Sequence, residues 1–163
     1  MTYKTHIIGG VALAIAVNKY FIPLEGIDLI YYYGSAVVGS LLPDLDHPKS
    51  WISSKTIILH YPFRKLGHRK ATHSLLAGLF LWAVLTLPFG INFVAIGSLL
   101  GYLSHLVLDM LNPKGVPLLY PFTKEKYKIG KIYTGDTGEY IVAILLMMIS
   151  GLMIVLKAKG EEQ

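Results

Sequence analysis

The sequence contains no cysteine among its 163 residues. Disulfide bonds and thiolate metal sites are therefore excluded, and any metal ion must be held by imidazole and carboxylate groups. Charged residues are also scarce, at 15% of the chain, whereas hydrophobic residues make up 53%. A soluble domain of this size carries more charge, so the composition indicates a small integral membrane protein.

Five apolar stretches contain most of the hydrophobic residues and predict the architecture. They cover approximately residues 7–22, 27–43, 73–89, 91–111 and 139–157. The last two are long enough to cross about 30 Å of hydrocarbon unaided, whereas the first three are close to the short limit. We therefore expect an all-α bundle of about five transmembrane or membrane-embedded helices, forming a single domain over residues 1–163.

Basic residues are concentrated in two segments between these stretches, residues 43–72 and 112–138. Together with Lys4, the two segments hold twelve of the fifteen Lys and Arg residues. If all five stretches span, both segments lie on the same side, which the positive-inside rule makes cytoplasmic. This predicts a multi-pass protein of the inner membrane with its N-terminus inside and its C-terminus outside. If one stretch were re-entrant, the two basic loops would lie on opposite faces.

Potential metal ligands lie at the ends of the apolar stretches and not at their centres. In the predicted topology seven of them meet at the cytoplasmic end of the bundle: His6, Asp44, Asp46, His73, His105, Asp109 and Glu139. Because imidazoles and carboxylates are ligands for divalent cations, this convergence predicts a metal centre at the membrane face.

The segment GYLSHLVLDML places His105 and Asp109 four residues apart. On a helix the two side chains lie on one face, one turn apart, so both can reach the same cation. Ionisable residues inside an apolar segment are costly and indicate function by default. The alternative is a His–Asp pair that only stabilises the end of a helix.

The segment LLPDLDHPKS contains Asp44, Asp46 and His47 between two prolines. The prolines stop the preceding helix and leave three potential ligands on a stiff turn. A carboxylate there could bridge two adjacent cations. The alternative is that these are ordinary loop residues after a helix.

The segment GHRKATHSLL contains His68, Arg69, Thr72 and His73. Thr72 is predicted to be the N-cap of a helix that begins near His73. Arg69 could bind a phosphate through two parallel hydrogen bonds, or it could contact lipid headgroups.

Taken alone, His6 and Glu139 each have a structural alternative. His6 could be an interfacial histidine, although Gly9 and Gly10 after it favour a close helix contact. Glu139 begins the fifth stretch, where a carboxylate is also favourable to the helix dipole.

Together these motifs resemble the YdjM-like family, described as LexA-regulated, membrane-bound, metal-dependent hydrolases. The resemblance covers nearly the whole chain and rests on His6, LLPDLDHPKS, GHRKATHSLL, GYLSHLVLDMLNPKGVPLLYPF and Glu139. That family is distantly grouped with the all-α zinc-dependent phospholipases C and P1-type nucleases, in which a His-x-x-x-Asp helix motif supplies metal ligands. The resemblance implies this role for His105 and Asp109, with Asp44 or Asp46 and one of His68 and His73 completing the cluster. Glu139 could replace a further ligand of those enzymes.

We therefore expect a phosphoesterase with one or two Zn²⁺ ions, or another divalent metal. The expected metal ligands are His6, Asp44, Asp46, His73, His105 and Asp109, and the expected catalytic residues are His47, His68, Arg69 and Glu139. The metal would activate water for attack on phosphorus. Arg69 would stabilise the developing charge, and His47 or His68 would protonate the leaving oxygen. A site at headgroup depth makes a phospholipid or lipid phosphate the expected substrate and membrane lipids the expected partners.

Two other classes of function stay open. A metal-ion transporter is disfavoured because transporters bind ions near the bilayer midplane, whereas these ligands crowd one end. A non-catalytic membrane protein with a structural metal would use the same ligands. A nucleic-acid substrate is not favoured, because the topology alone accounts for the basic residues. The sequence does not indicate an oligomeric state.

Overall fold

The computed structural model describes residues 1–46, 71–88 and 90–161, without the side chains of residues 46 and 157–161. Over these ranges the protein is helical, and its β structure consists of one bridge between Val116 and Tyr127. The helices are α1 (Tyr3–Tyr20), α2 (Gly26–Leu41), α5 (Leu75–Thr86), α6 (Phe93–Met110) and α7 (Thr137–Glu161), with short 3₁₀ turns η1 (Leu42–Asp46) and η2 (Ala71–His73).

Each of the five predicted apolar stretches corresponds to one α-helix, which confirms the all-α prediction for the described residues. Two helices are long and apolar enough to cross a membrane by length and composition, at Phe93–Met110 and Thr137–Leu156. These are the two stretches expected to span unaided. The third stretch forms only a 12-residue helix, which is about 18 Å long against a hydrocarbon thickness of about 30 Å.

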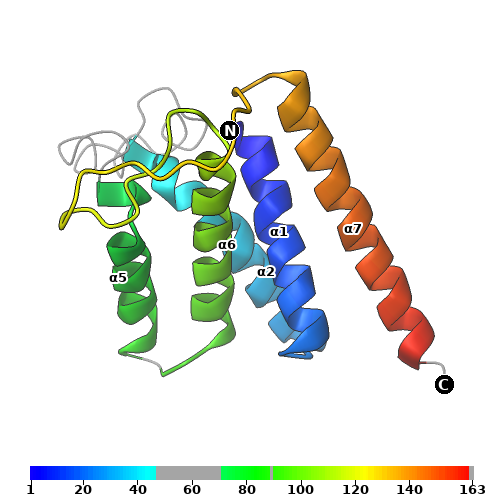
Figure 1. Ribbon diagram of the computed structural model, residues 1–163. Helices are drawn as coiled ribbons and strands as arrows, with labels where there is room; N and C mark the ends of the chain where they lie inside the picture. The colour runs from blue at the N-terminus through cyan, green and yellow to red at the C-terminus, as the bar shows by residue number, and fades with distance from the viewer. Residues whose placement is uncertain (47–70, 89, 162–163) are drawn as a thin grey trace.

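Helices α1, α2 and α6 form the centre of the bundle, with α5 on one side and α7 on the other (Figure 1). The contact between α2 and α6 is close because small residues face each other. A Cβ atom added to Gly101 would lie 2.0 Å from the Ala36 carbonyl oxygen, and one added to Gly39 would lie 2.1 Å from that of Ser98. Small residues of this kind let the backbones of membrane helices approach one another.

The predicted close contact at the start of α1 is also present. A Cβ atom on Gly9 would lie 2.5 Å from Cδ1 of Leu108, and one on Gly10 would lie 2.9 Å from Cβ of Ser40. Helix α1 therefore packs directly against both α6 and α2. This packing brings the face of α1 that carries His6 toward α6.

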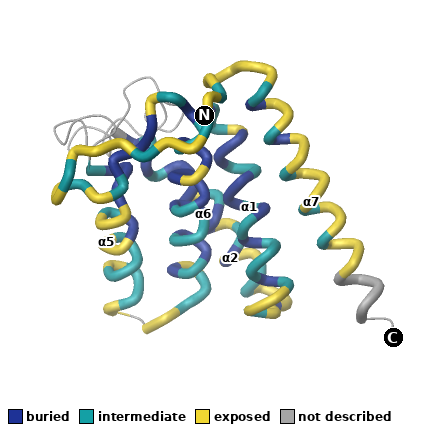
Figure 2. Tube along the Cα trace, viewed as in Figure 1, coloured by how far each residue is buried: buried dark blue, intermediate teal, exposed yellow. Residues whose placement is uncertain are grey.

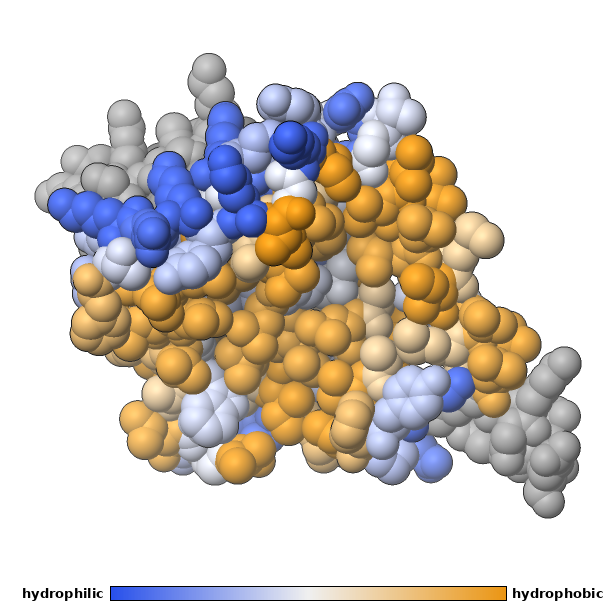
Figure 3. Space-filling view, in the orientation of Figure 1, coloured by the Kyte–Doolittle hydropathy of each residue, from blue (hydrophilic) through white to orange (hydrophobic). Residues whose placement is uncertain are grey.

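Helix α7 is attached to the bundle mainly along α1 and leaves most of its surface exposed (Figure 2). Only 11% of its apolar span is buried. In Figure 3 apolar residues cover the body of the molecule, and hydrophilic residues gather at the end that holds the N-terminus. An apolar surface of this extent indicates a membrane or a partner, not water.

The predicted basic loop 112–138 follows α6 and crosses the same hydrophilic end of the bundle (Figure 1). Its main chain is tied to the helices: Ile129 N–H donates to the Met110 carbonyl at 2.8 Å, and Leu75 N–H donates to the Leu118 carbonyl at 2.9 Å. All five lysines of this loop are exposed. The hydrophilic end of the bundle thus holds the start of α1, the end of α6 and the start of α7.

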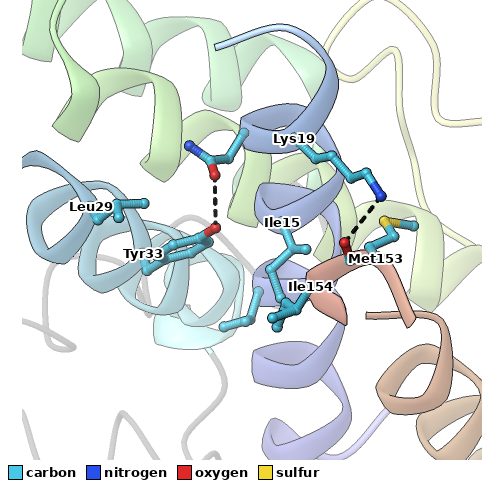
Figure 4. Close-up of a pocket in the computed structure, with 8 residues that line it drawn as sticks. Ile15, Lys19, Leu29, Tyr33, Met153 and Ile154 are labelled. Atoms are coloured by element: carbon cyan, nitrogen blue, oxygen red, sulfur yellow. Dashed lines mark hydrogen bonds between the residues drawn. The ribbon is translucent and has the colours of Figure 1, made fainter. Parts of the chain in front are cut away.

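A cavity of about 370 Å³ lies at the other end, between α1, α2 and α7 (Figure 4). Lys19 Nζ donates to the Met153 carbonyl at 3.1 Å at its edge, and the Tyr33 hydroxyl donates to Asn18 Oδ1 at 3.4 Å. The residues that line this cavity include no His, Asp or Glu. It is therefore not a candidate for the predicted metal centre.

Candidate metal centre

Five of the predicted ligands come together at the hydrophilic end of the bundle. His6 comes from α1, Asp44 from η1, His73 from η2, and His105 and Asp109 from α6. They form two overlapping groups, His6–Asp44–His105 and His73–His105–Asp109, and within each group the potential ligand atoms lie within 4.8 Å of one another. We call these five residues the His/Asp cluster.

The distances within the cluster fit donors that share a metal ion. His73 Nε2 lies 3.8 Å from Asp44 Oδ1 and 3.7 Å from Asp109 Oδ2. His105 Nε2 lies 4.0 Å and 3.8 Å from the same two atoms, and His6 Nε2 lies 3.4 Å from Asp109 Oδ1. These separations are too long for good hydrogen bonds. Ligands bonded to one Zn²⁺ at about 2.0–2.2 Å lie roughly 3–4 Å apart.

The cluster is buried, and some of its nitrogens are unsatisfied. The side chains of His6, His73, His105 and Asp109 are at most 1% exposed. Among the described residues, neither ring nitrogen of His6 has a hydrogen-bond partner, and Nε2 of His105 has none either. The Met1 amino group donates to Asp109 Oδ1 at 2.5 Å. Because unsatisfied buried polar atoms are costly, these nitrogens fit a site that binds a cation.

Contacts around the cluster orient its imidazoles. His105 Nδ1 lies 2.7 Å from the Ser40 carbonyl oxygen, and His73 Nδ1 lies 3.1 Å from Thr72 Oγ1. A hydrogen bond at one ring nitrogen leaves the other nitrogen for the metal and fixes the ring. The Tyr102 hydroxyl lies 2.6 Å from the carbonyl oxygen of Thr72, which holds the turn that carries His73.

The prediction that Thr72 caps the following helix is wrong. Helix α5 begins at Leu75, and its N-cap is Ser74, whose side chain accepts a hydrogen bond from Ala77 N–H at 3.2 Å. The reason is that residues 71–73 form a 3₁₀ turn, so the chain enters the helix later than expected. Thr72 contacts His73 instead.

Asp44 is the most exposed member of the cluster, with 19% of its side chain accessible. The rings of His6 and His105 are stacked with their centroids 3.6 Å apart, and His105 belongs to both potential ligand groups. The two groups are therefore overlapping alternatives for the shared Nε2 of His105, and the cluster is least buried at Asp44.

Glu139 is not brought into the cluster. Its Oε1 accepts hydrogen bonds from Thr2 N–H at 2.5 Å and from the Thr5 hydroxyl at 2.6 Å, and its Oε2 accepts one from Gly135 N–H at 2.6 Å. The residue thereby ties the start of α7 to the start of α1. Its expected catalytic role stays a prediction.

The remaining predicted site residues lie outside the part of the chain that is described. These are His47, His68 and Arg69, together with the side chain of Asp46. Their expected roles also stay predictions.

Two contributors to the site were missed by sequence reasoning. Tyr102 lies three residues before His105 on α6, so helix spacing could have indicated that it faces the site. Ser40 acts through its backbone carbonyl, for which no side-chain pattern exists.

Comparison with known proteins gives a family match over almost the whole chain. The family model described as YdjM inner membrane protein matches residues 1–162. The inner membrane protein YdjM of Escherichia coli (strain K12) is 43% identical over 130 residues, covering 74% of this chain and 66% of that protein, and the Shigella flexneri YdjM gives the same values. The match thus spans just under two thirds of the length of these two relatives.

YvsG of Bacillus subtilis (strain 168) is 34% identical over 151 residues, covering 92% of both chains. No solved structure matches the chain. The more distant similarity to zinc-dependent phospholipases C and P1-type nucleases is not among these matches and stays a prediction.

Proposed function

The chain belongs to the family of YdjM inner membrane proteins, and from this premise we propose that it is a membrane-bound, metal-dependent phosphoesterase. Its substrate would be a phospholipid or lipid phosphate at the cytoplasmic face. The observation that carries this proposal is the buried His/Asp cluster with its unsatisfied imidazole nitrogens, at one end of an apolar helical bundle.

The donor set suits catalysis by a divalent metal. Catalytic zinc sites have three protein ligands and keep another position open. Either group in the cluster offers three ligand atoms, and because both groups share His105, only one of them can be complete at a time. A bound Zn²⁺ would supply Lewis-acid activation of water and of a phosphoryl oxygen. Asp44, as the partly exposed member, would face the approaching substrate.

The proposal includes five membrane passes, with the N-terminus and the cluster in the cytoplasm and the C-terminus outside. Two observations support this topology: the connecting loop after α6 crosses the same end as the N-terminus, and its lysines are exposed. Lysines at that depth attract anionic headgroups. Arg69 and His68 would then stabilise charge and transfer a proton at the phosphoryl group, with His47 as the alternative acid.

A structural metal is the second candidate, because four of the five cluster residues are almost completely buried. A closed coordination shell would bind the ion without turnover. The exposure of Asp44 favours the catalytic site over the closed one. Transport is disfavoured, since the cluster lies at helix ends and not at the midplane.

The proposal is tested by hydrolysis assays on the zinc-loaded protein with a panel of phospholipids and lipid phosphates. We expect Asp109→Asn to lower turnover by at least ~100-fold, because loss of a ligand should cost no less than loss of a residue that orients one. Asp28→Asn, near the opposite end of the bundle, is the matched control and should retain full activity. Turnover retained in Asp109→Asn would refute the assignment, and metal binding without turnover of any substrate would favour the structural site.

A further inference from the structure

A second hollow, of about 400 Å³, runs along the outside of the bundle between α2, α5 and α6. Half of its lining comes from α2, including Ile30, Gly34 and Val38, and Leu42 of η1 lines it as well. The lining contains no charged residue, and its rim is open, with Ile30 67% and Val38 52% exposed. We call this hollow the α2–α5–α6 groove. In the proposed topology this apolar groove would face the membrane.

The groove leads toward the His/Asp cluster. Leu42, which lines one end, is followed directly by Pro43 and Asp44, the partly exposed member of the cluster. From Ile30 to Leu42 the chain advances by 12 residues, which is about 18 Å at helical rise. One leaflet of the hydrocarbon core is about 15 Å deep. The groove therefore has the length of a lipid chain that ends at the cluster.

We propose that the α2–α5–α6 groove holds an acyl chain of the substrate, with the phosphate group at the metal position of the His/Asp cluster, beside Asp44. This inference rests on the proposed function and specifies its substrate: a long-chain lipid phosphoester, not a short water-soluble phosphate. The volume lies within the usual range of ligand pockets, about 300–1,000 Å³.

Gly34 offers a variant that should obstruct the groove. Gly34 lines the groove, and a Cβ atom added there meets no atom within 4 Å, so we expect the ring of Gly34→Phe to occupy the groove. Gly151 on α7 is the matched control, because an added Cβ there also meets nothing within 4 Å and the residue does not line the groove. Gly151→Phe should therefore behave like the unmodified protein.

The experiment measures binding of hexadecyl phosphate and butyl phosphate to zinc-loaded protein by native mass spectrometry, with zinc content determined for each variant. Each methylene group that is buried increases the affinity about fourfold. We expect the unmodified protein and Gly151→Phe to bind hexadecyl phosphate at least ~10-fold more tightly than butyl phosphate. Gly34→Phe should lose this preference while it retains zinc and butyl phosphate binding.

Turnover of the same compounds separates the two proposals. If the protein hydrolyses phosphoesters but Gly34→Phe and Gly151→Phe show equal chain-length preference, the groove inference is overturned and the proposed function stands. If nothing is hydrolysed but Gly34→Phe alone loses binding of the long chain, the groove is a binding site for a lipid chain and the proposed function fails. Loss of zinc in Gly34→Phe alone would also count against the groove, since it would show that the variant acts on the cluster.

Discussion

His105 is the residue through which the parts of the cluster are connected. It belongs to both potential ligand groups, stacks on His6 from α1, and has its Nδ1 fixed by the carbonyl of Ser40 at the end of α2. Its Nε2 thus points into the cluster without a hydrogen-bond partner among the described residues. One imidazole therefore couples the packing of three helices to the position of a potential ligand atom.

Thr72 is predicted to hold the ring of His73 in the orientation that a metal ion needs. Thr72→Val removes the hydroxyl that lies 3.1 Å from His73 Nδ1. We expect zinc affinity to fall about 10–100-fold, as for other residues that orient metal ligands. Titration against a competing chelator measures this change.

The control for Thr72→Val is Thr86→Val. The Thr86 hydroxyl donates to the Trp82 carbonyl at 2.8 Å, within α5 and away from the cluster. Equal zinc affinity in the two variants would show that Thr72 does not orient His73.

The contact between α2 and α6 sets the geometry of the site at the scale of helices. Asp44 follows the end of α2, whereas His105 and Asp109 belong to α6. The separation of these two helices therefore fixes the distance between ligands that lie far apart in the sequence. Small residues at the contact, such as Gly101, determine that separation.

Gly101→Val should force α2 and α6 apart. Its Cβ would lie 2.0 Å from a backbone oxygen of α2, which cannot rotate away as a side chain can. We expect the stability of the folded protein to fall by about 1–3 kcal/mol or more, as for other overpacked sites. Zinc content should fall as well. Thermal unfolding in detergent and metal analysis measure the two effects.

Gly151→Val is the comparison, since an added Cβ there meets nothing within 4 Å. It should unfold at the same temperature as the unmodified protein. If Gly101→Val also unfolds there and keeps its zinc, helix separation does not control the cluster.

The helices could be predicted from sequence because long apolar runs and their polar ends are local signals. The bounds differ by two to four residues at several ends, and the third stretch, predicted from His73, is α-helical only from Leu75. There the hydroxyl of Tyr102 donates to the carbonyl of Thr72, thirty residues earlier in the chain, and so stabilises the 3₁₀ turn. Such long-range contacts override local helix propensity, and the hydrophobic periodicity of the sequence does not indicate them.

The cluster was only partly predictable. The spacing of His105 and Asp109 placed both on one face of a helix, and topology placed His6, Asp44 and His73 at the same end. Topology placed Glu139 at the same end too, but its carboxylate accepts hydrogen bonds from Thr2, Thr5 and Gly135 and does not join the cluster. Helix ends can be inferred from hydropathy, but the partner that each side chain selects there depends on packing at the ångström scale.

On the face of the molecule that Figure 3 shows, apolar residues cover the middle, smaller hydrophilic groups lie at one end, and most of the hydrophilic residues gather at the opposite end. The lysines after α6 and the cluster share that end, which in the proposed topology faces the cytoplasm. Within the described ranges, only α6 and α7 qualify as spans by length and composition. The orientation of the other helices relative to the membrane is therefore the part of the topology that needs a direct measurement.

The absence of cysteine makes that measurement clean, because any introduced thiol is unique. In intact spheroplasts a membrane-impermeant maleimide should label Glu25→Cys and Ile91→Cys, which lie in loops proposed to face outward. Lys124→Cys, in the loop after α6, should be labelled only after permeabilisation. Labelling of Lys124→Cys and Ile91→Cys from the same side would contradict five passes.

If the His/Asp cluster binds a metal ion, as we propose, gently purified protein should contain that ion. Mass spectrometry compares its metal content with that of the double variant His105→Ala, Asp109→Ala. We expect one or two zinc ions, or another divalent metal, per chain in the unmodified protein and none in the variant, with both proteins monodisperse in detergent. A metal-free unmodified protein, or equal metal content in the two, would contradict this proposal.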